Sequence, residues 1–526
     1  GDGLINRGLA TWVDSVPVKK PGKAPVAQRR LFEATLDARL VALDAATGTP
    51  CLDFGKGGEV SLREVARYSP GQYHMTSPPA VVDDLVVVGS AIDDNSRVDM
   101  PSGVVRAFDA RTGALRWSWE PLPPNASPAH ADASAKPWRT GAGNAWSVMA
   151  VDSERHLVFV PTGSPSPDYF GGFRPGDNKW ANSIVALRAK TGEVAWGFQL
   201  VHHDLWDYDT AAPPLLATIE HNGEKIPVVI VGNKTGFLYV LNRDTGKPVF
   251  PVEERAVPQS DVPGEVSSPT QPFPVALPAL VPQTLAPAAA WGINDGERAA
   301  GRARLQALRN EGIFTPPSLK GTLVIPGNVG GMNWSGFAFD PERQLLVVNV
   351  NNLPAEVRLI PRAEFDRKQR SEHGEYSAQA GTPYGMFRSF LQAPSGMPCS
   401  PPPWGMLTAV DLAAGKIRWQ VPLGSMGVLE QGQSNVPPGS ISLGGPIVTA
   451  GGLAFIAGTI DSTIRAFDVE TGKELWRAQL PASGAATPMT YQTRNGGKQF
   501  LVIAAGGHAK VEEETQSDAV VAFALP

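Results

Sequence analysis

The sequence predicts an all-β protein, a β-propeller built from repeated antiparallel sheets, and a recurring turn motif is the main observation. In each copy a strand-like run ends in a polar residue, and a Thr-Gly or Ala-Gly pair follows within a few positions. The six copies begin at Leu43, Phe108, Leu187, Leu241, Val410 and Phe467. Repeats at intervals of several tens of residues are typical of solenoids and propellers. The long, irregular insertions between copies favour a closed ring over an open solenoid.

Each copy predicts a β-hairpin. Residues Thr463–Phe467 alternate as a strand with one buried face does, and the Asp-x-x-Thr-Gly segment after it supplies a tight turn. The next strand carries a Trp in four copies, at Trp117, Trp196, Trp419 and Trp476. An indole is large enough to fill the space between two sheets. One repeat is therefore expected to bury its apolar face only against the next.

Two long insertions interrupt what we interpret as a single domain over residues 1–526. Gly 55 and Pro 49 are high but dispersed, as many turns and ordered loops require. The stretch from about 250 to 320 is predicted to be an extended loop followed by a short helix around Arg302–Arg309, and the second insertion spans about 353 to 403. Long loops in compact domains commonly carry function. Both insertions are expected to cover a site on one face of the ring.

Charge and hydropathy exclude two classes of partner. The net charge of −5 comes without a basic stripe, which argues against nucleic-acid binding. No apolar run approaches the roughly 20 residues of a membrane-spanning helix, so no transmembrane segment is expected. The chain opens at Gly1 without a signal peptide, as a processed or trimmed chain would. Cys51 and Cys399 are the only cysteines, and a disulfide or two separate thiols are both open.

Two polar clusters are candidates for chemistry. Residues His202–Asp209 combine two histidines and three aspartates with aromatic neighbours, and burial of such charges is costly unless they bind a metal or transfer a proton. The alternative is a polar loop whose aspartates cap turns. Asp93, Asp94 and Asn95 directly follow a strand and offer the oxygen ligands that Ca²⁺ prefers. A simple turn is the alternative there.

Several motifs together carry a family resemblance. They are Trp206–Asp209, Lys234 within Asn-Lys-Thr-Gly-Phe, Ser268–Phe273, Gly330–Trp334, Pro402–Asp411 and Ala486–His508. This set resembles the quinoprotein dehydrogenases that bind pyrroloquinoline quinone (PQQ), and it is most similar to the membrane glucose, quinate and shikimate dehydrogenase group. The resemblance covers nearly the whole chain. It implies an eight-bladed propeller of the W-motif quinoprotein type. The segment Asn6–Trp12 matches a region about one blade into the family pattern, so part of the first blade is expected to be absent.

The resemblance also implies roles for individual residues. Asp207 matches the general base that takes the proton of the substrate hydroxyl, and Lys234 matches the cation that bonds the quinone oxygens. The other matches to the cofactor are the stacking Trp146 and the amides Asn144, Asn333 and Asn349. The metal ligands implied are Asp93, Asp94, Ser164, Asp207 and Asp209. Calcium is the expected ion, with magnesium and a lanthanide left open. Capping aspartates, a solvent-facing lysine, a blade-wedge Trp and ordinary turn amides are the alternatives for these positions.

The activity implied is PQQ-dependent oxidation of a hydroxyl on a sugar or cyclic polyol, with glucose as the family's usual substrate and the periplasm as the location. A non-sugar secondary alcohol is the first alternative, such as a quinate-like acid or a polycyclic mycotoxin. A non-catalytic propeller scaffold is the second. No Cys-Cys pair is present, which separates the chain from the alcohol dehydrogenase branch. No Cys-x-x-Cys-His is present either, so electrons are expected to pass to an external quinone, dye or cytochrome.

Overall fold

The computed structural model describes residues 5–15, 27–64, 68–122, 140–367, 372–426, 438–508 and 515–525. Strands dominate it, and helix is confined to short segments, which confirms the all-β prediction. The expectation about the start of the chain concerns Gly1, which lies outside these residues. In the part of the chain described, no helix is both long enough and apolar enough to cross a membrane.

Seven antiparallel sheets form the repeating unit, five with four strands and two with three. The first three are β1–β4 (Ala10–Val13, Arg29–Ala34, Arg39–Asp44, Glu59–Ser61), β6, β7, β9 and β10 (Ala80–Val82, Leu85–Val88, Val105–Asp109, Leu115–Trp119) and β11–β14 (Ala150–Asp152, Leu157–Pro161, Ser183–Arg188, Val194–Gln199). The fourth is three-stranded, β15–β17 (Leu215–His221, Glu224–Gly232, Leu238–Asn242).

The chain then continues into three further blade sheets. The fifth contains β21, β22, β26 and β27 (Ala338–Asp340, Leu345–Asn351, Gly405–Asp411, Lys416–Pro422). The sixth is β28–β31 (Ile447–Val448, Leu453–Ile456, Thr463–Asp468, Glu474–Gln479), and the seventh is β32–β34 (Met489–Gln492, Gln499–Ala505, Ala519–Ala524). The propeller architecture is as predicted. The described residues form seven blade sheets where the family pattern implies eight.

The repeated turn has the geometry that its sequence predicts. In the copy at the end of β9, Asp109 Oδ1 accepts hydrogen bonds from the backbone N–H of Thr112 at 2.8 Å and from its hydroxyl at 2.9 Å. Asp468 holds Thr471 in the same way at 2.9 and 2.8 Å. The aspartate therefore closes the turn through its own side chain, which is the usual function of Asp in such turns.

The tryptophans join consecutive blades. Trp117 of β10 donates its indole N–H to Ala189 O of the next blade at 2.7 Å, and Trp419 of β27 donates to Val469 O at 2.9 Å. A Cβ on Gly192 would lie 2.6 Å from the Trp117 ring, and one on Gly472 would lie 2.7 Å from Trp419. The turn glycines Gly192, Gly246 and Gly472 thus admit the indole of the preceding blade, and this explains why the two recur together in these copies.

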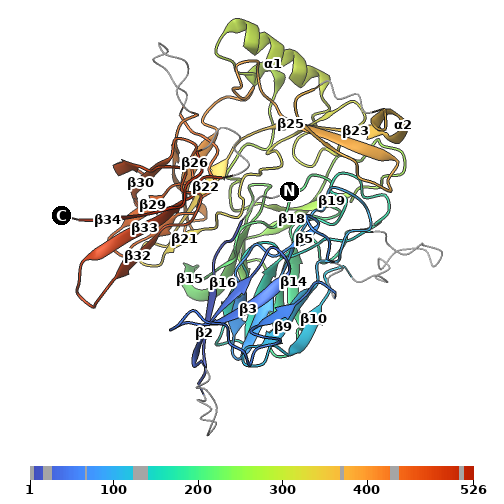
Figure 1. Cartoon of the computed structure of the whole chain (residues 1–526). Helices are drawn as coiled ribbons and strands as arrows, with labels where there is room; N and C mark the ends of the chain where they lie inside the picture. Colours follow the sequence, from blue (N-terminus) through green and yellow to red (C-terminus); the bar gives the residue numbers. More distant parts are fainter. Residues whose placement is uncertain are drawn as a thin grey trace.

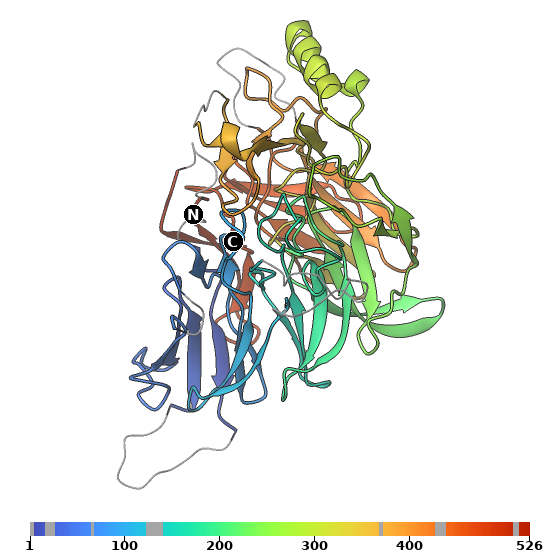
Figure 2. The same ribbon diagram turned by 90° about the vertical axis from the view of Figure 1, so that its right-hand side faces the viewer.

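Parts of the two insertions form a layer on one side of the blades, where α1, β23 and β25 lie (Figures 1 and 2). The first contains the hairpin β18–β19 (Val252–Ala256, Thr270–Pro274), the 3₁₀ turn η1 (Pro287–Ala289) and the helix α1 (Asp295–Ala307). A second sheet has the order β20-β23-β25-β24 (Thr322–Val324, Ala355–Pro361, Tyr384–Phe390, Glu375–Ser377), with helix α2 (Arg362–Phe365) beside it. The predicted helix is present and starts earlier than expected, because Asn294 caps it through the backbone N–H of Glu297.

The two cysteines are free. Cys51 belongs to an apolar cluster of the first blades, and Cys399 packs with the residues under α1. Both thiols are buried, and burial raises the pKa of each above its ordinary value. The disulfide alternative is therefore wrong, and both cysteines serve as small apolar core residues.

Candidate active site

A cavity of about 540 Å³ lies between the loops of the blades and the second insertion. Ligand pockets in proteins commonly have volumes of this order. Seven of the ten residues predicted for the site line it: Asp93, Asp94, Trp146, Asp207, Asp209, Lys234 and Asn333. The short strands β5 (Tyr73–His74) and β8 (Ala91–Ile92) pair with each other and carry Asp93 and Asp94 to its wall.

The loop between β14 and β15 sends alternate side chains in opposite directions. Trp206 and Tyr208 are buried, and they donate to Thr315 O and Pro326 O, both at 2.7 Å. Asp207 and Asp209, at the alternate positions, line the cavity. The aromatic pair anchors the loop to Thr315, near the end of the first insertion, and to Pro326, which follows that insertion. The two carboxylates therefore face the cavity from a loop that is firmly anchored.

Asp204 holds the same loop through its side-chain carboxylate. Its carboxylate accepts from the backbone N–H groups of Trp206 at 3.1 Å and Tyr208 at 2.9 Å, and from the hydroxyl of Ser164. Asp207 has a φ of 62°, in the left-handed region that a residue with a Cβ rarely adopts. Such conformations are concentrated at functional sites, where surrounding contacts hold them in place. Here the contacts of Asp204 on either side supply that support.

Lys234 lies between the two aspartates. Its Nζ is 2.6 Å from Asp207 Oδ1 and 2.8 Å from Asp209 Oδ2. Burial raises the pKa of the Asp207 carboxyl to about 6, although the charges of Lys234 and Arg388 act in the opposite direction. Burial also opposes ionisation of Asp209, but Lys234 holds its pKa below the ordinary value. The two carboxylates therefore differ in basicity, and Asp207 is the better proton acceptor.

Two glycines permit this close packing. A Cβ on Gly163 would lie 2.6 Å from Asp209 Oδ1 and 3.3 Å from the indole nitrogen of Trp146. Gly330 has a φ of +80°, and a Cβ there would lie 2.4 Å from the Cβ of Lys234. Any larger residue at either position would displace a side chain of the cavity wall. This is the physical basis of the Gly-Gly motif at residues 330 and 331.

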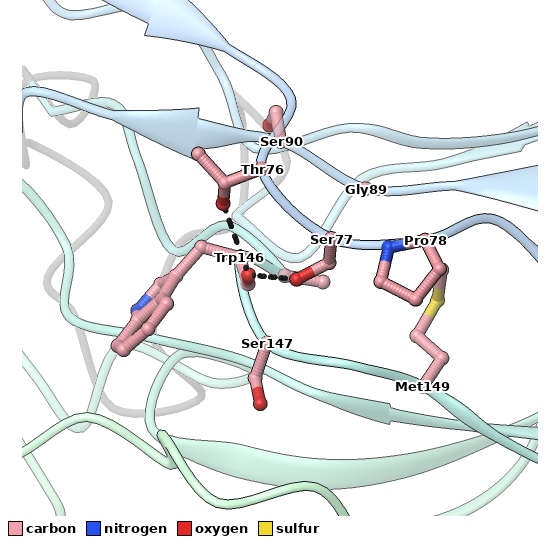
Figure 3. Close-up of a pocket in the computed structure, with 9 residues that line it drawn as sticks. Thr76, Ser77, Pro78, Gly89, Ser90, Trp146, Ser147 and Met149 are labelled. Atoms are coloured by element: carbon pink, nitrogen blue, oxygen red, sulfur yellow. Dashed lines mark hydrogen bonds between the residues drawn. The ribbon is translucent and has the colours of Figure 1, made fainter. Parts of the chain in front are cut away.

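Trp146 is held by its backbone, and its ring lies against the guanidinium of Arg7. The Ser77 hydroxyl donates to the Trp146 carbonyl at 2.5 Å, and the Thr76 hydroxyl donates to the same oxygen at 3.5 Å. Figure 3 shows the indole pointing away from these two hydroxyl groups. The guanidinium of Arg7 lies 5.1 Å from the centre of the Trp146 ring and 5.3 Å from that of Trp334. Planar groups can therefore lie against this indole.

Three predicted residues do not line the cavity. Ser164 is fully buried, and its backbone N–H donates to Asp209 Oδ1 at 2.6 Å. Asn144 donates to Ser90 O at 2.6 Å, and Asn349 of β22 donates to Ser442 Oγ at 3.0 Å. The structure places Ser164 as a support for Asp204 and Asp209, behind the wall. Asn144 and Asn349 each keep a buried side-chain oxygen without a hydrogen-bond partner among the described residues.

Sequence reasoning missed four charged residues of the wall, Asp168, Arg388, Arg7 and Glu375. Asp168 is 1% exposed; burial, followed by the charges of Asp94 and the aspartates of the 207–209 loop, raises its pKa well above the ordinary value. Asp168 follows the Thr-Gly-Ser segment by only four residues, and that proximity was the available signal. Arg388 had no such signal, because its contact with Asp207 spans 181 residues.

The cavity wall holds polar atoms that a ligand could satisfy. Both side-chain atoms of Asn95 and Oδ1 of Asp168 are buried without a hydrogen-bond partner within the described residues. Unpaired buried groups cost free energy, typically about 1–3 kcal/mol each, unless a ligand or ion binds them. Within the same residues, no group of three His, Cys, Asp or Glu side chains is arranged to hold a metal ion. The unsatisfied atoms thus fit a polar cofactor, and a metal would need amide or cofactor oxygens as further ligands.

The two insertions contribute differently to the site. Glu375 of β24 and Arg388 and Phe390 of β25 line the cavity, and no residue from 250 to 320 does. The expectation that both insertions cover the site is therefore correct for the second and wrong for the first. The first insertion instead contacts residues that support the cavity wall. Its Glu265 accepts from the backbone N–H of Gly171 at 2.5 Å and lies 2.8 Å from His203 Nε2.

Glu265 is expected to stabilise the loop that carries Asp207, and its effect should depend on pH. Burial opposes its ionisation, but the contact with His203 holds the pKa of Glu265 below its ordinary value. A lowered carboxyl pKa stabilises the fold above the unfolded-state pKa of about 4.3, and this stabilisation is lost as the pH falls. Glu265→Gln should therefore lower the free energy of unfolding by about 2 kcal/mol at pH 7. Thermal unfolding from pH 7 down to about pH 2 measures this, and the difference from wild type should shrink as the pH falls below about 4.3 and through the lowered pKa of Glu265.

Glu254→Gln is the matched control. Glu254 also lies beside a histidine, 3.1 Å from His202 Nε2, but its side chain is 51% exposed. Exposed pairs contribute little to stability. An equal loss of stability in both variants would contradict the assignment of Glu265.

Comparison with known proteins matches nearly the whole chain to one family. The PQQ family model, described as "Glucose/ethanol/alcohol dehydrogenase, beta-propeller domain", matches residues 1–501. The chain belongs to this PQQ dehydrogenase family. The quinate/shikimate dehydrogenase (quinone) of Acinetobacter baylyi is 37% identical, with 99% of this chain and 67% of the relative aligned. The quinoprotein glucose dehydrogenase of Escherichia coli is 39% identical, with 99% of this chain and 66% of the relative aligned.

Solved structures agree on the fold of this PQQ dehydrogenase family member. The quinohemoprotein alcohol dehydrogenase of Comamonas testosteroni superposes with a TM-score of 0.64 at 24% identity, over 99% of this chain and 66% of that one. A europium-containing methanol dehydrogenase gives 0.62 at 24% identity, over 96% of this chain and 73% of that one. The chain spans about two thirds of the length of the quinate/shikimate and glucose dehydrogenase relatives.

Proposed function

We propose that the chain is the catalytic propeller of a PQQ-dependent dehydrogenase that oxidises a hydroxyl group of a sugar or cyclic polyol. One observation carries the proposal: Asp207, with a pKa raised to about 6 by burial, lies 2.6 Å from the Lys234 ammonium inside the cavity. A base near neutral pKa next to a fixed cation is what removal of a hydroxyl proton requires. The family match and the curated glucose and quinate relatives support the same activity.

Each residue of the wall has a defined task in this proposal. PQQ, when bound, accepts the hydride from the carbon that bears the hydroxyl. Asp207 receives the hydroxyl proton on a carboxylate oxygen. Lys234 keeps Asp209 ionised and presents a positive charge to the cavity. The Trp146 indole offers a flat apolar surface, and Arg7 and Asn333 place donors on the same wall for the polar edge of the cofactor.

A metal ion is part of the proposal, with calcium as the ion expected. Asp168 and Asn95 support it, since each lines the cavity with a buried polar atom that lacks a partner among the described residues. Asp94, Asp168 and Asp209 line the same cavity, and the charges of Asp94 and Asp209 contribute to the raised pKa of Asp168. Hard cations such as Ca²⁺ favour carboxylate and amide oxygens. Metal analysis of the loaded protein and the change in melting temperature on Ca²⁺ or La³⁺ addition test this point.

Reconstitution tests the function directly. The apoprotein is loaded with PQQ and Ca²⁺, and dye reduction is followed with glucose, quinate, cyclitols and polycyclic secondary alcohols. We expect turnover with at least one cyclic hydroxyl compound and a change in PQQ absorbance on binding. Binding of PQQ without oxidation of any member of the panel would contradict the proposal. A quinate-like acid or polycyclic alcohol oxidised in preference to glucose would select the alternative substrate class.

The location and the electron acceptor complete the proposal. We infer a periplasmic enzyme that passes electrons to a separate quinone or cytochrome. The curated relatives are bacterial, and two are named as quinone-linked or quinoprotein dehydrogenases, which supports this. Fractionation of producing cells and assays with ubiquinone analogues check both parts.

A further inference from the structure

Arg388 is the charged residue through which the second insertion reaches the candidate base. It lies on β25, directly opposite Glu375 of β24 in the sheet register. Its Nη1 donates to Asp207 Oδ2 at 3.0 Å and to the Tyr169 hydroxyl at 2.7 Å. Its Nε and Nη2 lie 2.9 and 2.8 Å from Glu375 Oε2. The guanidinium is thus held in one orientation at the cavity wall, with its side chain only 16% exposed.

Both oxygens of Asp207 are occupied by cations. Lys234 holds Oδ1 at 2.6 Å, and Arg388 holds Oδ2 at 3.0 Å. A hydroxyl that gives its proton to Asp207 must approach one of these oxygens to within about 3 Å. The longer and therefore weaker contact is the one to Arg388, so Oδ2 is the oxygen more open to a hydroxyl. A substrate bound there lies directly beside the guanidinium.

The guanidinium has donors available for that substrate. Arginine carries five N–H groups in a rigid fork, and the contacts above use four of them. When a hydroxyl takes the place of the Arg388 contact on Oδ2, a second donor becomes available. The unused donor and the released one then lie beside the reacting hydroxyl. We expect them to reach an oxygen on the carbon next to it.

We propose that Arg388 selects substrates with a second, uncharged oxygen on the carbon adjacent to the reacting hydroxyl, as in vicinal diols and ring polyols. The contacts of Arg388 favour an uncharged group. Its guanidinium already faces two carboxylates, Asp207 at 3.0 Å and Glu375 at 2.8 Å, so a third anionic group on the same fork is disfavoured. The inference rests on the proposed dehydrogenase function and specifies its substrate class.

Two isomers of one compound test the inference. The PQQ-loaded enzyme is assayed by dye reduction with cis-1,2-cyclohexanediol and cis-1,4-cyclohexanediol, which differ only in the spacing of their hydroxyls. The wild type should favour the 1,2 isomer in kcat/KM by about tenfold or more, the value of one hydrogen bond to a charged donor. Arg388→Gln should remove this preference. Any effect of the substitution on Asp207 acts on both isomers alike, so the ratio isolates recognition.

Two further variants make the test specific. Arg358→Gln is the matched control: Arg358 lies on β23 of the same sheet, its guanidinium is 5.3 Å from the Phe387 ring, and it does not line the cavity. Its isomer ratio should equal that of the wild type. Arg388→Lys keeps the charge beside Asp207 but lacks the fork, so it should retain turnover of the 1,4 isomer without restoring the preference. Thermal unfolding verifies that each variant is folded.

The outcomes separate this inference from the function itself. If the loaded wild type oxidises no hydroxyl compound, the dehydrogenase function fails. If it oxidises both isomers equally, or if Arg388→Gln keeps the 1,2 preference, the role of Arg388 alone is overturned. An effect of Arg388→Gln confined to quinate, with an unchanged diol ratio, also overturns it, because the recognised group would then be a carboxylate.

Discussion

Replacing Asp207 with asparagine is expected to lower kcat about a thousandfold. Asparagine keeps the size of the side chain and can still contact Lys234, but it has no basic oxygen to take the hydroxyl proton. General base catalysis typically contributes 10²- to 10⁴-fold to the rate, about 3 to 5 kcal/mol of barrier lowering. The measurement is dye reduction by the PQQ-loaded variant at saturating substrate. Because the Lys234 ammonium and the Trp146 ring remain, PQQ should still bind.

Asp177→Asn is the matched control for this variant. Asp177 is an exposed aspartate whose carboxylate accepts from Ser268 at 3.1 Å, and it does not line the cavity. The same loss of charge at this position should leave kcat within about twofold of the wild type. If Asp207→Asn retained more than a tenth of the wild-type kcat with PQQ bound, the assignment of Asp207 as the base would be wrong.

Removing the Lys234 side chain is expected to weaken PQQ retention by at least about tenfold and to lower kcat by about a hundredfold. The ammonium lies between Asp207 and Asp209, so Lys234→Ala leaves Asp209 without its cationic partner and Asp207 with Arg388 alone, facing an acidic ligand. Loss of one fixed charge that stabilises a transition state commonly costs 10²- to 10³-fold in kcat. Titration of PQQ by quenching of tryptophan fluorescence measures the affinity, and absorbance after gel filtration measures retention.

Comparison with Asp207→Ala separates the two roles. That variant keeps the ammonium in place, so it should retain PQQ better than Lys234→Ala does. Lys247→Ala, at an exposed position in the hairpin turn after β17, controls for loss of a lysine and should retain PQQ fully. Circular dichroism of Lys234→Ala shows whether loss of the ammonium disturbs the fold. Equal PQQ retention in Lys234→Ala and Asp207→Ala would contradict the separate assignment of binding and proton transfer.

The sequence predicted those features that depend on contacts between residues close together in the chain. The Asp-x-x-Thr-Gly turn is closed by hydrogen bonds between residues three and four positions apart, from Thr112 to the Asp109 carboxylate and from the Gly113 N–H to the Asp109 carbonyl, so the motif predicts the hairpin wherever it occurs. Trp206–Asp209 is equally local. Its alternation of aromatic and acidic residues decides that two side chains anchor the loop and two face the cavity. The propeller could therefore be predicted from the repeat, and Asp207 from the resemblance of Trp206–Asp209 to the family motif.

Tertiary structure decided everything that joins distant segments. Arg388 reaches Asp207 across 181 residues because the sheet of β23 and β25 packs over the blade loops. Asp168 becomes an unpaired buried carboxylate only when the 207–209 loop closes beside it, and Ser164 is drawn behind the wall by Asp204. The sequence by itself determined the repeat, the turns and the alternating carboxylates, since these depend on bonds within a few residues. The charge around the base was decided by packing between blades and insertion, because electrostatic contacts depend on distance in space.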